Sequence, residues 1–359
     1  METRTLGEIT IPRLVLGTMA YGTHRARAQQ IDTIRAAIDA GMFAIDTAPL
    51  YHFGRTESVL GEALRGRPEA RVLGKVGIRW GDDARGEVML RTQVGGKALV
   101  ARKDARPQSV RRDVEESLRR LGRERLDLCQ IHHPDVQTPI AETMGELLRL
   151  RDEGKIGAIG VSNMSVAQLR AAKDALGSVP LSSQQLEYSL LAPHGRAGLE
   201  AAKAMGVGTL VYSPLHRGAL VGGAAERARL HAQDPRRWRM PFVHANAQRI
   251  DAAIEASVAP IARRTGSSVA QVVLAWLLHQ PYVDALVVGA SSPEQVETTA
   301  AATSLTLTPE DIRSIAWTFA GVALDPDARP RRRELAEAQA RRVAGAVLRR
   351  VGRLANLFR

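Results

Sequence analysis

The chain has 359 residues, of which 45% are hydrophobic and only 4% aromatic, with a formal net charge of +12 and a single cysteine, Cys129. A single cysteine excludes an intramolecular disulfide. The N-terminus does not resemble a signal peptide, and no run reaches the roughly 18 consecutive apolar residues of a membrane span. We therefore expect a cytoplasmic protein without a membrane span. Ten arginines and two glutamates at 329–359 carry +8 of the charge and leave +4 for residues 1–328, so no nucleic-acid partner is expected.

After a short hairpin predicted at residues 5–12, apolar segments of strand length alternate with amphipathic segments of helix length. The predicted strands are 13–17, 42–46, 71–77, 126–132, 158–162, 181–188, 209–213 and 284–289. The predicted helices are 28–40, 56–64, 107–121, 140–152, 166–175, 196–204, 269–279 and 293–302. In the third helix Val110, Val114 and Leu118 recur at helical spacing, and Gly122 ends the pattern. Eight strand–helix alternations predict an α/β fold, a (β/α)8 TIM barrel.

We expect one barrel domain over residues 1–325 and a basic C-terminal extension at 326–359, either helical or flexible. The alternative fold, a doubly wound open sheet, is disfavoured because the first strand leads into GTMAYG and not into a GxGxxG turn. In the extension, Val343, Val347 and Val351 would share one helical stripe flanked by arginines. The sequence leaves open whether this stripe docks on the barrel or on a second subunit, stays solvated, or meets a membrane or nucleic acid.

Two insertions interrupt the alternation, at residues 76–106 and 217–244. Both leave the carboxyl ends of predicted strands, where barrel enzymes place their sites. They are interpreted as long loops on that face and as candidate substrate lids, with ordinary surface loops as the alternative.

Four chemically active side chains come at or just after predicted strand ends. Asp46 closes one strand and Tyr51 follows it, while Lys75 lies near the end of the next strand and His132 ends the one after. Such a set can build a tyrosine general acid, because a nearby ammonium favours the phenolate, a carboxylate holds the ammonium and an imidazole orients the substrate oxygen. Lowering a tyrosine pKa by about three units takes roughly 4 kcal/mol, most of which Lys75 is expected to supply.

The surrounding sequence resembles the aldo-keto reductase family, and most closely its bacterial general-stress and aryl-alcohol-dehydrogenase-like members. Seven blocks match in family order: LGTMAYG (16–22), DTAPLYHFGRTE (46–57), SLRRLGRERLDLCQIHHPD (117–135), IGAIGVSN (156–163), QLEY (185–188), VYSPL (211–215) and VVGASSPEQ (287–295). The resemblance implies reversible, NADPH-dependent reduction of an aldehyde, ketone or sugar carbonyl. It assigns Tyr51 as general acid and base, with Asp46, Lys75 and His132 completing the tetrad.

The resemblance also implies the cofactor site. Ser162, Asn163 and Gln185 would bind the carboxamide and Tyr212 would stack on the nicotinamide. The full expected set is Gly17, Thr18, Met19, Asp46, Ser162, Asn163, Gln185, Tyr212, Ser213, Pro214, Leu215, Gly218, Gly289, Ser291, Ser292, Gln295 and Thr299. Many family members carry Arg or Lys where this chain has Ser291 or Gln295, and Asn where it has Thr299. Because a 2′-phosphate prefers a cation, this departure counts against NADPH. Some family members with the same GASS and Gln arrangement nevertheless use NADPH, and the long loop offers Arg217, Arg236, Arg237 and Arg239, so NADPH is predicted, with NADH possible.

The substrate is expected to be a small carbonyl compound held by Tyr21, His52, Trp80 and His133, just beyond the strand ends. Because successive residues of an extended strand point to opposite sides, only one of His132 and His133 is expected to face the site. No metal site is predicted, and an oligomer is possible. The alternative function is a nicotinamide-binding regulatory or partner subunit with little turnover.

Overall fold

The computed structural model describes residues 1–23, 26–94, 96–222 and 244–325. The chain forms two compact units, which we call the barrel unit (residues 1–214 and 274–306) and the helical unit (residues 215–273 and 307–359). The predicted C-terminal extension and most of the second insertion lie outside the described residues. The domain boundary at residue 325 therefore stays a prediction.

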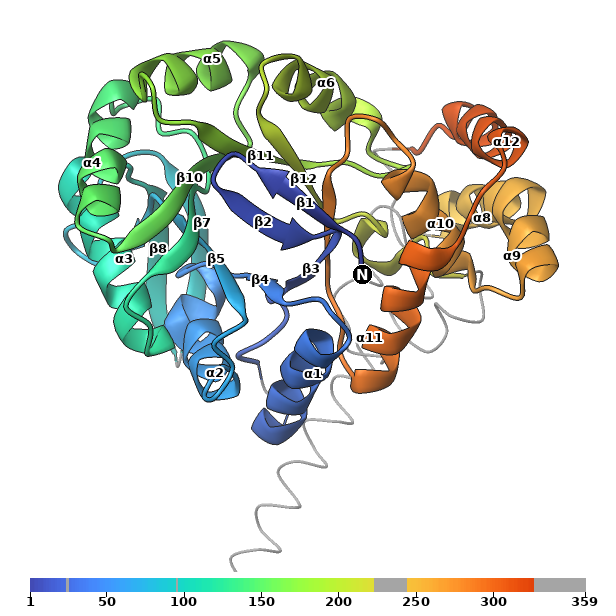
Figure 1. Ribbon diagram of the computed structural model, residues 1–359, viewed down its shortest axis with the longest axis horizontal. Coiled ribbons are helices and arrows are strands. Elements are labelled where there is room, and N and C mark those ends of the chain that lie inside the picture. The colour runs from blue at the N-terminus through green and yellow to red at the C-terminus, as the bar shows by residue number, and fades with distance from the viewer. Residues whose placement is uncertain (24–25, 95, 223–243, 326–359) are drawn as a thin grey trace, which may run out of the picture. The chain divides into compact units, whose positions relative to one another are not determined.

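Eight parallel strands close into a barrel in the barrel unit (Figure 1). They are β3 (Leu14–Gly17), β4 (Ala44–Asp46), β5 (Arg71–Val76), β9 (Leu126–Ile131), β10 (Ile156–Ser162), β11 (Leu181–Glu187), β12 (Gly208–Tyr212) and β13 (Ala285–Val288). Neighbouring strands pair in chain order, and β13 returns to pair with β3. Each predicted strand overlaps one of these eight, so the predicted (β/α)8 barrel is confirmed.

Helices α1 to α6 and α11 belong to the barrel unit and surround the strands (Figure 1). Their bounds are α1 (Arg27–Asp39), α2 (Arg55–Ala63), α3 (Pro107–Leu121), α4 (Ile140–Asp152), α5 (Val166–Ala175), α6 (Arg196–Ala204) and α11 (Pro293–Ala300). Local signals explain the sharp ends: Pro107 opens α3 and Gly122 ends it with a left-handed φ of 63°. Ser165 and Gln168 form a capping box at the start of α5.

The N-terminal hairpin closes the end of the barrel where the strands begin. Strands β1 (Thr3–Leu6) and β2 (Ile9–Pro12) pair antiparallel, and Figure 1 shows them lying across the barrel strands. Leu6, Ile9 and Ile11 are buried in one cluster with apolar residues from the barrel strands. The hairpin thus supplies the apolar floor of the barrel and leaves the opposite, carboxyl end for chemistry.

The first insertion is more ordered than the predicted loop. Residues of β6 (Ile78–Trp80), β7 (Val88–Val94) and β8 (Lys97–Lys103) form a three-stranded antiparallel sheet in the order β6–β8–β7. Arg79 and the backbone N–H of Gly77 both donate to the buried carboxylate of Asp113 on α3, at 2.9 and 2.8 Å. The base of this sheet is therefore fixed to the barrel wall, which positions Trp80 beyond the end of β5.

The helical unit contains α8 (His244–Ala253), the π-helix η6 (Ile254–Val258), α9 (Ala259–Thr265) and α12 (Pro309–Ala320), and helix α10 (Val269–Leu278) runs from it into the barrel unit. Of its described elements, the sequence predicted only α10. Arg264 donates twice to Asp311, both at 2.7 Å, which ties α9 to α12. Across the described ranges of both units, every helix is too short or too polar to cross a membrane.

Candidate active site

The carboxyl ends of β4 and β5 bring three of the four predicted catalytic residues into direct contact. The Lys75 Nζ atom donates to Asp46 Oδ1 in a buried ion pair and lies 3.3 Å from the Tyr51 hydroxyl. Lys75 and Asp46 are 1% and 2% exposed, whereas Tyr51 is half-buried. The phenol therefore ends next to a fully buried, paired ammonium, the arrangement predicted from the order of strand ends.

Burial and charge act against each other on this cluster. Burial by itself would lower the pKa of Lys75, but the Asp46 carboxylate and the Tyr51 oxygen raise it above its ordinary value. Burial raises the pKa of Tyr51, and the Lys75 charge opposes this rise without reversing it. The prediction that Lys75 lowers the tyrosine pKa well below its ordinary value is thus wrong for this structure. Desolvation of the phenolate outweighs one neighbouring ammonium, and Tyr51 is protonated at neutral pH.

His132 lies beside the tyrosine, and its neighbour does not point away. The rings of Tyr51 and His132 meet edge to face, with centroids 5.8 Å apart. The rings of His132 and His133 are stacked at 5.3 Å, so the expectation that they face opposite sides is wrong. Strand β9 ends at Ile131, and the two histidines follow in a bend where strand alternation no longer applies.

Both imidazoles are neutral at physiological pH. Burial, followed by the charge of Lys75, lowers the pKa of His132 well below its ordinary value. Burial and the charges of Lys103 and Lys75 lower the pKa of His133 to about 4. A neutral His132 can donate a hydrogen bond to an oxygen without placing a second positive charge beside Lys75.

A left-handed turn follows Tyr51 and holds it at the strand end. His52, Phe53 and Gly54 have φ angles of 48°, 55° and 84°, a strained run for the two residues that are not glycine. A Cβ on Gly54 would lie 2.8 Å from Cδ of Arg120. Glu57, fully buried on α2, accepts a hydrogen bond from Arg120 at 2.7 Å. The second half of the DTAPLYHFGRTE block, residues 52–57, is therefore structural: it holds the turn that positions the Tyr51 phenol.

The residues expected to bind a carboxamide gather at the ends of β10, β11 and β12. Asn163, at a left-handed φ of 60°, donates to the His132 carbonyl oxygen at 2.9 Å and accepts from the Tyr212 hydroxyl at 2.9 Å. The Asn163 amide also lies 3.0 Å from Ser162 Oγ. Asn163 therefore connects the predicted nicotinamide seat to the histidine loop.

Gln185 makes a contact that sequence reasoning missed. Its Nε2 donates to Asp46 Oδ2 at 2.9 Å, opposite the oxygen that pairs with Lys75. Gln185 is 2% exposed, so the Asp46 carboxylate is fixed on both oxygens inside the barrel. Residues from β4, β5 and β11 thus form one buried network, and no local sequence signal could have linked β11 to Asp46.

The predicted adenosine-side residues follow β13. Ser292 caps α11 by accepting from the Gln295 N–H, with Pro293 next, which confirms the cap read from the sequence. The Gln295 side chain accepts from both the N–H and the hydroxyl of Ser291, each at 2.8 Å. Thr299 lies on the same helix and Gly289 is exposed before it. Helix α11 itself carries glutamates and no Lys or Arg.

The remaining expected cofactor residues have different environments. Gly17 ends β3, and Thr18 is buried and donates to the Asp46 carbonyl oxygen at 2.7 Å. Met19 follows and is 59% exposed. Ser213, at φ 56°, and Pro214 are the last residues of the first segment of the barrel unit, whereas Leu215 and Gly218 belong to the helical unit.

The four predicted substrate residues do not share one role in this structure. Tyr21 is 3% exposed and donates its hydroxyl to the Ala290 carbonyl oxygen at 2.9 Å, so it joins the loops after β3 and β13. Trp80 packs edge to face on Phe53, with centroids 5.4 Å apart. His52, Trp80 and His133 are each only partly buried; His52 lies in the short 3-10 turn after β4, Trp80 ends β6 and His133 lies in the bend after β9. Phe53 is a further candidate wall residue that sequence reasoning did not select.

No group of three or more His, Cys, Asp or Glu side chains suited to a metal ion occurs among the residues that the structure describes. Cys129, the sole cysteine, is buried in β9, and burial raises its pKa.

Comparison with known proteins decides the family. A sequence model of the aldo/keto reductase family matches residues 13–317. The chain belongs to the aldo/keto reductase family. It is 34% identical over 315 residues to the aldo-keto reductase YhdN of Bacillus subtilis, covering 86% of this chain and 88% of that protein. It is also 34% identical over 320 residues to the NADH-specific methylglyoxal reductase of Escherichia coli, covering 85% and 93%.

Solved structures agree with this aldo-keto reductase assignment. The glycerol dehydrogenase of Gluconobacter oxydans superposes with a TM-score of 0.76 at 32% identity, covering 90% of this chain and 97% of that one. An aldo-keto reductase of Bacillus halodurans has a TM-score of 0.71 at 24% identity and shows the same fold. The protein is a nicotinamide-dependent oxidoreductase of the class that reduces carbonyl groups.

Proposed function

We propose that Tyr51 is the general acid of this aldo-keto reductase and protonates the carbonyl oxygen during reduction. The nicotinamide cofactor supplies the hydride, which no side chain of this set carries. Lys75, 3.3 Å from the phenol, stabilises the negative charge left on the tyrosine oxygen, and Asp46 keeps Lys75 in place. The observation that carries this proposal is the contact of a half-buried phenol with a buried Lys–Asp pair.

His132 orients the substrate in this proposal. Its neutral ring lies edge to face with Tyr51, so a carbonyl oxygen between the two can accept hydrogen bonds from both. Proton donation then comes from the phenol, because the histidine carries no titrating proton at neutral pH. The imidazole fixes the direction from which the oxygen approaches.

The amides at the strand ends suit the carboxamide of a nicotinamide ring. Ser162, Asn163 and Gln185 present hydroxyl, amide N–H and carbonyl groups within one region of the barrel mouth, and Tyr212 adds a half-buried ring. These groups are matched in kind to a planar amide and an aromatic ring. They would hold the cofactor next to Tyr51.

For the dinucleotide itself, the sequence favoured NADPH, whereas the described helix α11 supports NADH. Ser291 and Gln295 bind one another, and α11 offers Glu294 and Glu297 but no cation to a 2′-phosphate. A relative is named an NADH-specific reductase. We therefore propose that NADH is used at least as well as NADPH.

Small carbonyl compounds are the proposed substrates. The relatives are named for methylglyoxal and glycerol, both three-carbon molecules, and the partly buried rings of Trp80 and His133 lie beyond the strand ends. Methylglyoxal, glyceraldehyde and dihydroxyacetone are the first compounds to test.

The deciding experiment compares Tyr51→Phe with the full-length wild type. Consumption of NADH and of NADPH is followed with the three carbonyls, and cofactor binding is measured by nicotinamide fluorescence. Tyr51→Phe is expected to abolish reduction and keep cofactor binding. The control is Tyr282→Phe, which removes a buried hydroxyl that bonds to Tyr188 at 2.8 Å and is expected to leave turnover unchanged.

Two outcomes would count against the proposal. Unchanged turnover in Tyr51→Phe would show that another group donates the proton. Tight cofactor binding without turnover of any carbonyl in the wild type would favour the alternative of a regulatory or partner subunit.

A further inference from the structure

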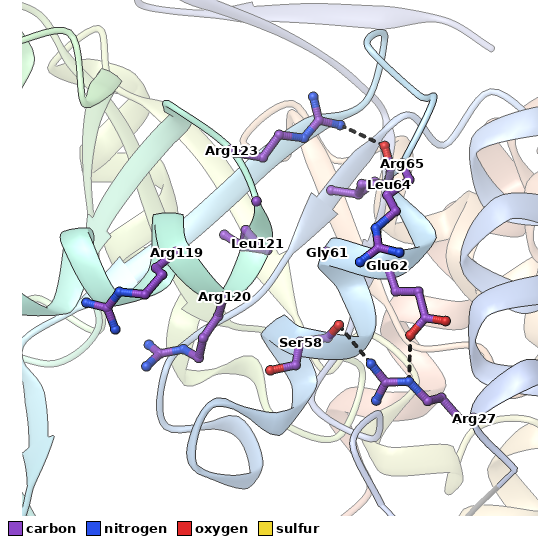
Figure 2. A pocket seen from close by; sticks show the side chains of 11 residues that line it. Arg27, Ser58, Gly61, Glu62, Leu64, Arg65, Arg119, Arg120, Leu121 and Arg123 are labelled. Atoms are coloured by element: carbon purple, nitrogen blue, oxygen red, sulfur yellow. Dashed lines mark hydrogen bonds and ion pairs between the residues drawn. The ribbon is translucent and has the colours of Figure 1, made fainter.

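A pocket lined by arginines lies among α1, α2 and the end of α3, away from the tetrad. It has a volume of about 220 Å³, and its charged lining consists of Arg27, Arg65, Arg119, Arg120, Arg123 and Glu62. Figure 2 shows these side chains, with Arg27, Glu62 and Arg65 on one side and Arg119, Arg120 and Arg123 at the end of α3 on the other. Five guanidinium groups thus share a lining with one carboxylate.

Only part of this positive charge is compensated. Arg27 donates to Glu62 at 2.7 Å, and Arg120 donates to the buried Glu57 at 2.7 Å and to Glu116 at 3.4 Å. Arg123 donates to the carbonyl oxygens of Leu64 and Arg67.

The guanidinium groups of two of the five arginines have no ion-pair partner among the described residues. Arg65 and Arg119 are exposed, and their guanidinium groups make no hydrogen bond or ion pair with any described residue. The Nη2 atom of Arg120 is buried and has no hydrogen-bond partner in the described structure. Cations are favoured at helix C-termini, which gives Arg119 and Arg120 in the last turn of α3, and Arg65 just after α2, a structural role as well. That role provides no partner for the buried Nη2 atom of Arg120.

Size and lining restrict what the pocket can hold. Its volume is below the roughly 300–1,000 Å³ of sites for drug-sized ligands. The only apolar side chains in its lining, Leu64 and Leu121, offer no aromatic face on which a nucleobase would stack. Guanidinium groups match phosphate oxygens in geometry and bind them with charge-assisted hydrogen bonds.

The pocket does not belong to the proposed active site. Arg65 follows the C-terminal end of α2, and Arg119 to Arg123 surround that of α3. In a (β/α)8 barrel the active site lies at the carboxyl ends of the strands, and the helices return from there toward the other face. A ligand bound by Arg65 and Arg119 would therefore not touch Tyr51 or Lys75.

We propose that this pocket is a second, non-catalytic binding site for a small, multiply charged phosphate compound, with Arg65 and Arg119 as its free anchoring cations.

The test uses inorganic pyrophosphate and the full-length protein. Binding is measured by isothermal titration calorimetry in the presence of saturating NADH, because the dinucleotide site can itself accept a diphosphate. Wild type is expected to bind one pyrophosphate per chain. Each of Arg65→Ala and Arg119→Ala is expected to weaken binding by about tenfold, and the double variant to abolish it, since each removes one charge-assisted contact.

The matched control is Arg170→Ala, on α5, which removes an exposed arginine outside the pocket and is expected to leave binding unchanged. Tyr51→Phe is expected to bind pyrophosphate like wild type, which separates this proposal from the proposed catalytic function. The proposal is overturned if no pyrophosphate binds beside NADH, or if the double variant binds it as well as Arg170→Ala does.

Discussion

Replacing Lys75 by methionine should cost far more stability than an ordinary lysine substitution. The side chain is 1% exposed and pairs with Asp46, which is 2% exposed. Removing one partner of a buried pair leaves an uncompensated charge and costs about 3–5 kcal/mol. We expect Lys75→Met to lower the free energy of unfolding by that amount, although Gln185 still donates to the carboxylate at 2.9 Å.

The assay is urea unfolding followed by circular dichroism at neutral pH. The pair raises the pKa of Lys75 in the folded protein, so its contribution is fully present below the ordinary lysine pKa of about 10.4 and is lost only as the pH rises through the higher folded value. A measurement at neutral pH therefore reports the whole effect.

The matched control is Lys103→Met, the same substitution at an ion pair with Glu87, whose side chain is 57% exposed. Exposed pairs contribute about 0–1 kcal/mol, so this variant should unfold nearly like wild type. The double variant Asp46→Asn with Lys75→Met should recover part of the loss, because neither side chain then carries a buried charge. If Lys75→Met and Lys103→Met destabilise equally, Asp46 and Lys75 do not form the buried charge pair described above.

Three further predictions follow from the same geometry. Burial raises the pKa of Tyr51, so the phenol keeps its proton and the rate of carbonyl reduction should stay constant up to about pH 9. The reverse alcohol oxidation needs the phenolate, so its rate should rise about tenfold per pH unit over the same range. Reduction and oxidation rates with the same pH profile would refute this. Gln295→Arg should raise the ratio of kcat/KM for NADPH to that for NADH by about 10–100-fold, because a charge-assisted hydrogen bond to the 2′-phosphate is worth about 1.5–3 kcal/mol. An unchanged ratio would show that the 2′-phosphate does not bind at this helix. Gly54→Ala should lower the free energy of unfolding by more than about 1 kcal/mol and slow turnover, because the φ of residue 54 is 84° and the new Cβ would lie 2.8 Å from Arg120. A variant as thermally stable as wild type would contradict this prediction.

The barrel was predictable from the sequence because its signals are local. Each buried strand is a short apolar run. Pro107 and Ser165 mark the starts of α3 and α5, and Gly122 marks the end of α3. The antiparallel sheet at β6–β8–β7 was missed, since its exposed strands mix charged and apolar residues and are stabilised by pairing with one another. The described helices α8, α9 and α12 were missed as well, because α8 and α9 are additional helices between β12 and α10, and α12 follows the last strand–helix pair.

The candidate site was predictable in composition but not in its electrostatic balance. The order of strand ends was enough to place Asp46, Tyr51 and Lys75 together. The direction of the Tyr51 pKa depends on how deeply the phenol is buried, which the sequence does not state. The stacking of His132 on His133 depends on where β9 ends, and a difference of one residue at a strand end reverses the expected side.

The DTAPLYHFGRTE block thus contains both the reactive phenol and the residues that hold it in position. Within DTAPLYHFGRTE, Asp46 and Tyr51 belong to the buried charge network, whereas Gly54 and Glu57 lie against Arg120 of α3. A sequence match alone does not separate these roles, since all four residues are equally part of the block. The separation comes from geometry: a side chain that faces Lys75 can alter the proton affinity of the phenol, and one that faces α3 can only alter where the phenol stands. Variants of Glu57 should accordingly lose stability and turnover together, while variants of Asp46 should also change the pH dependence of the oxidation.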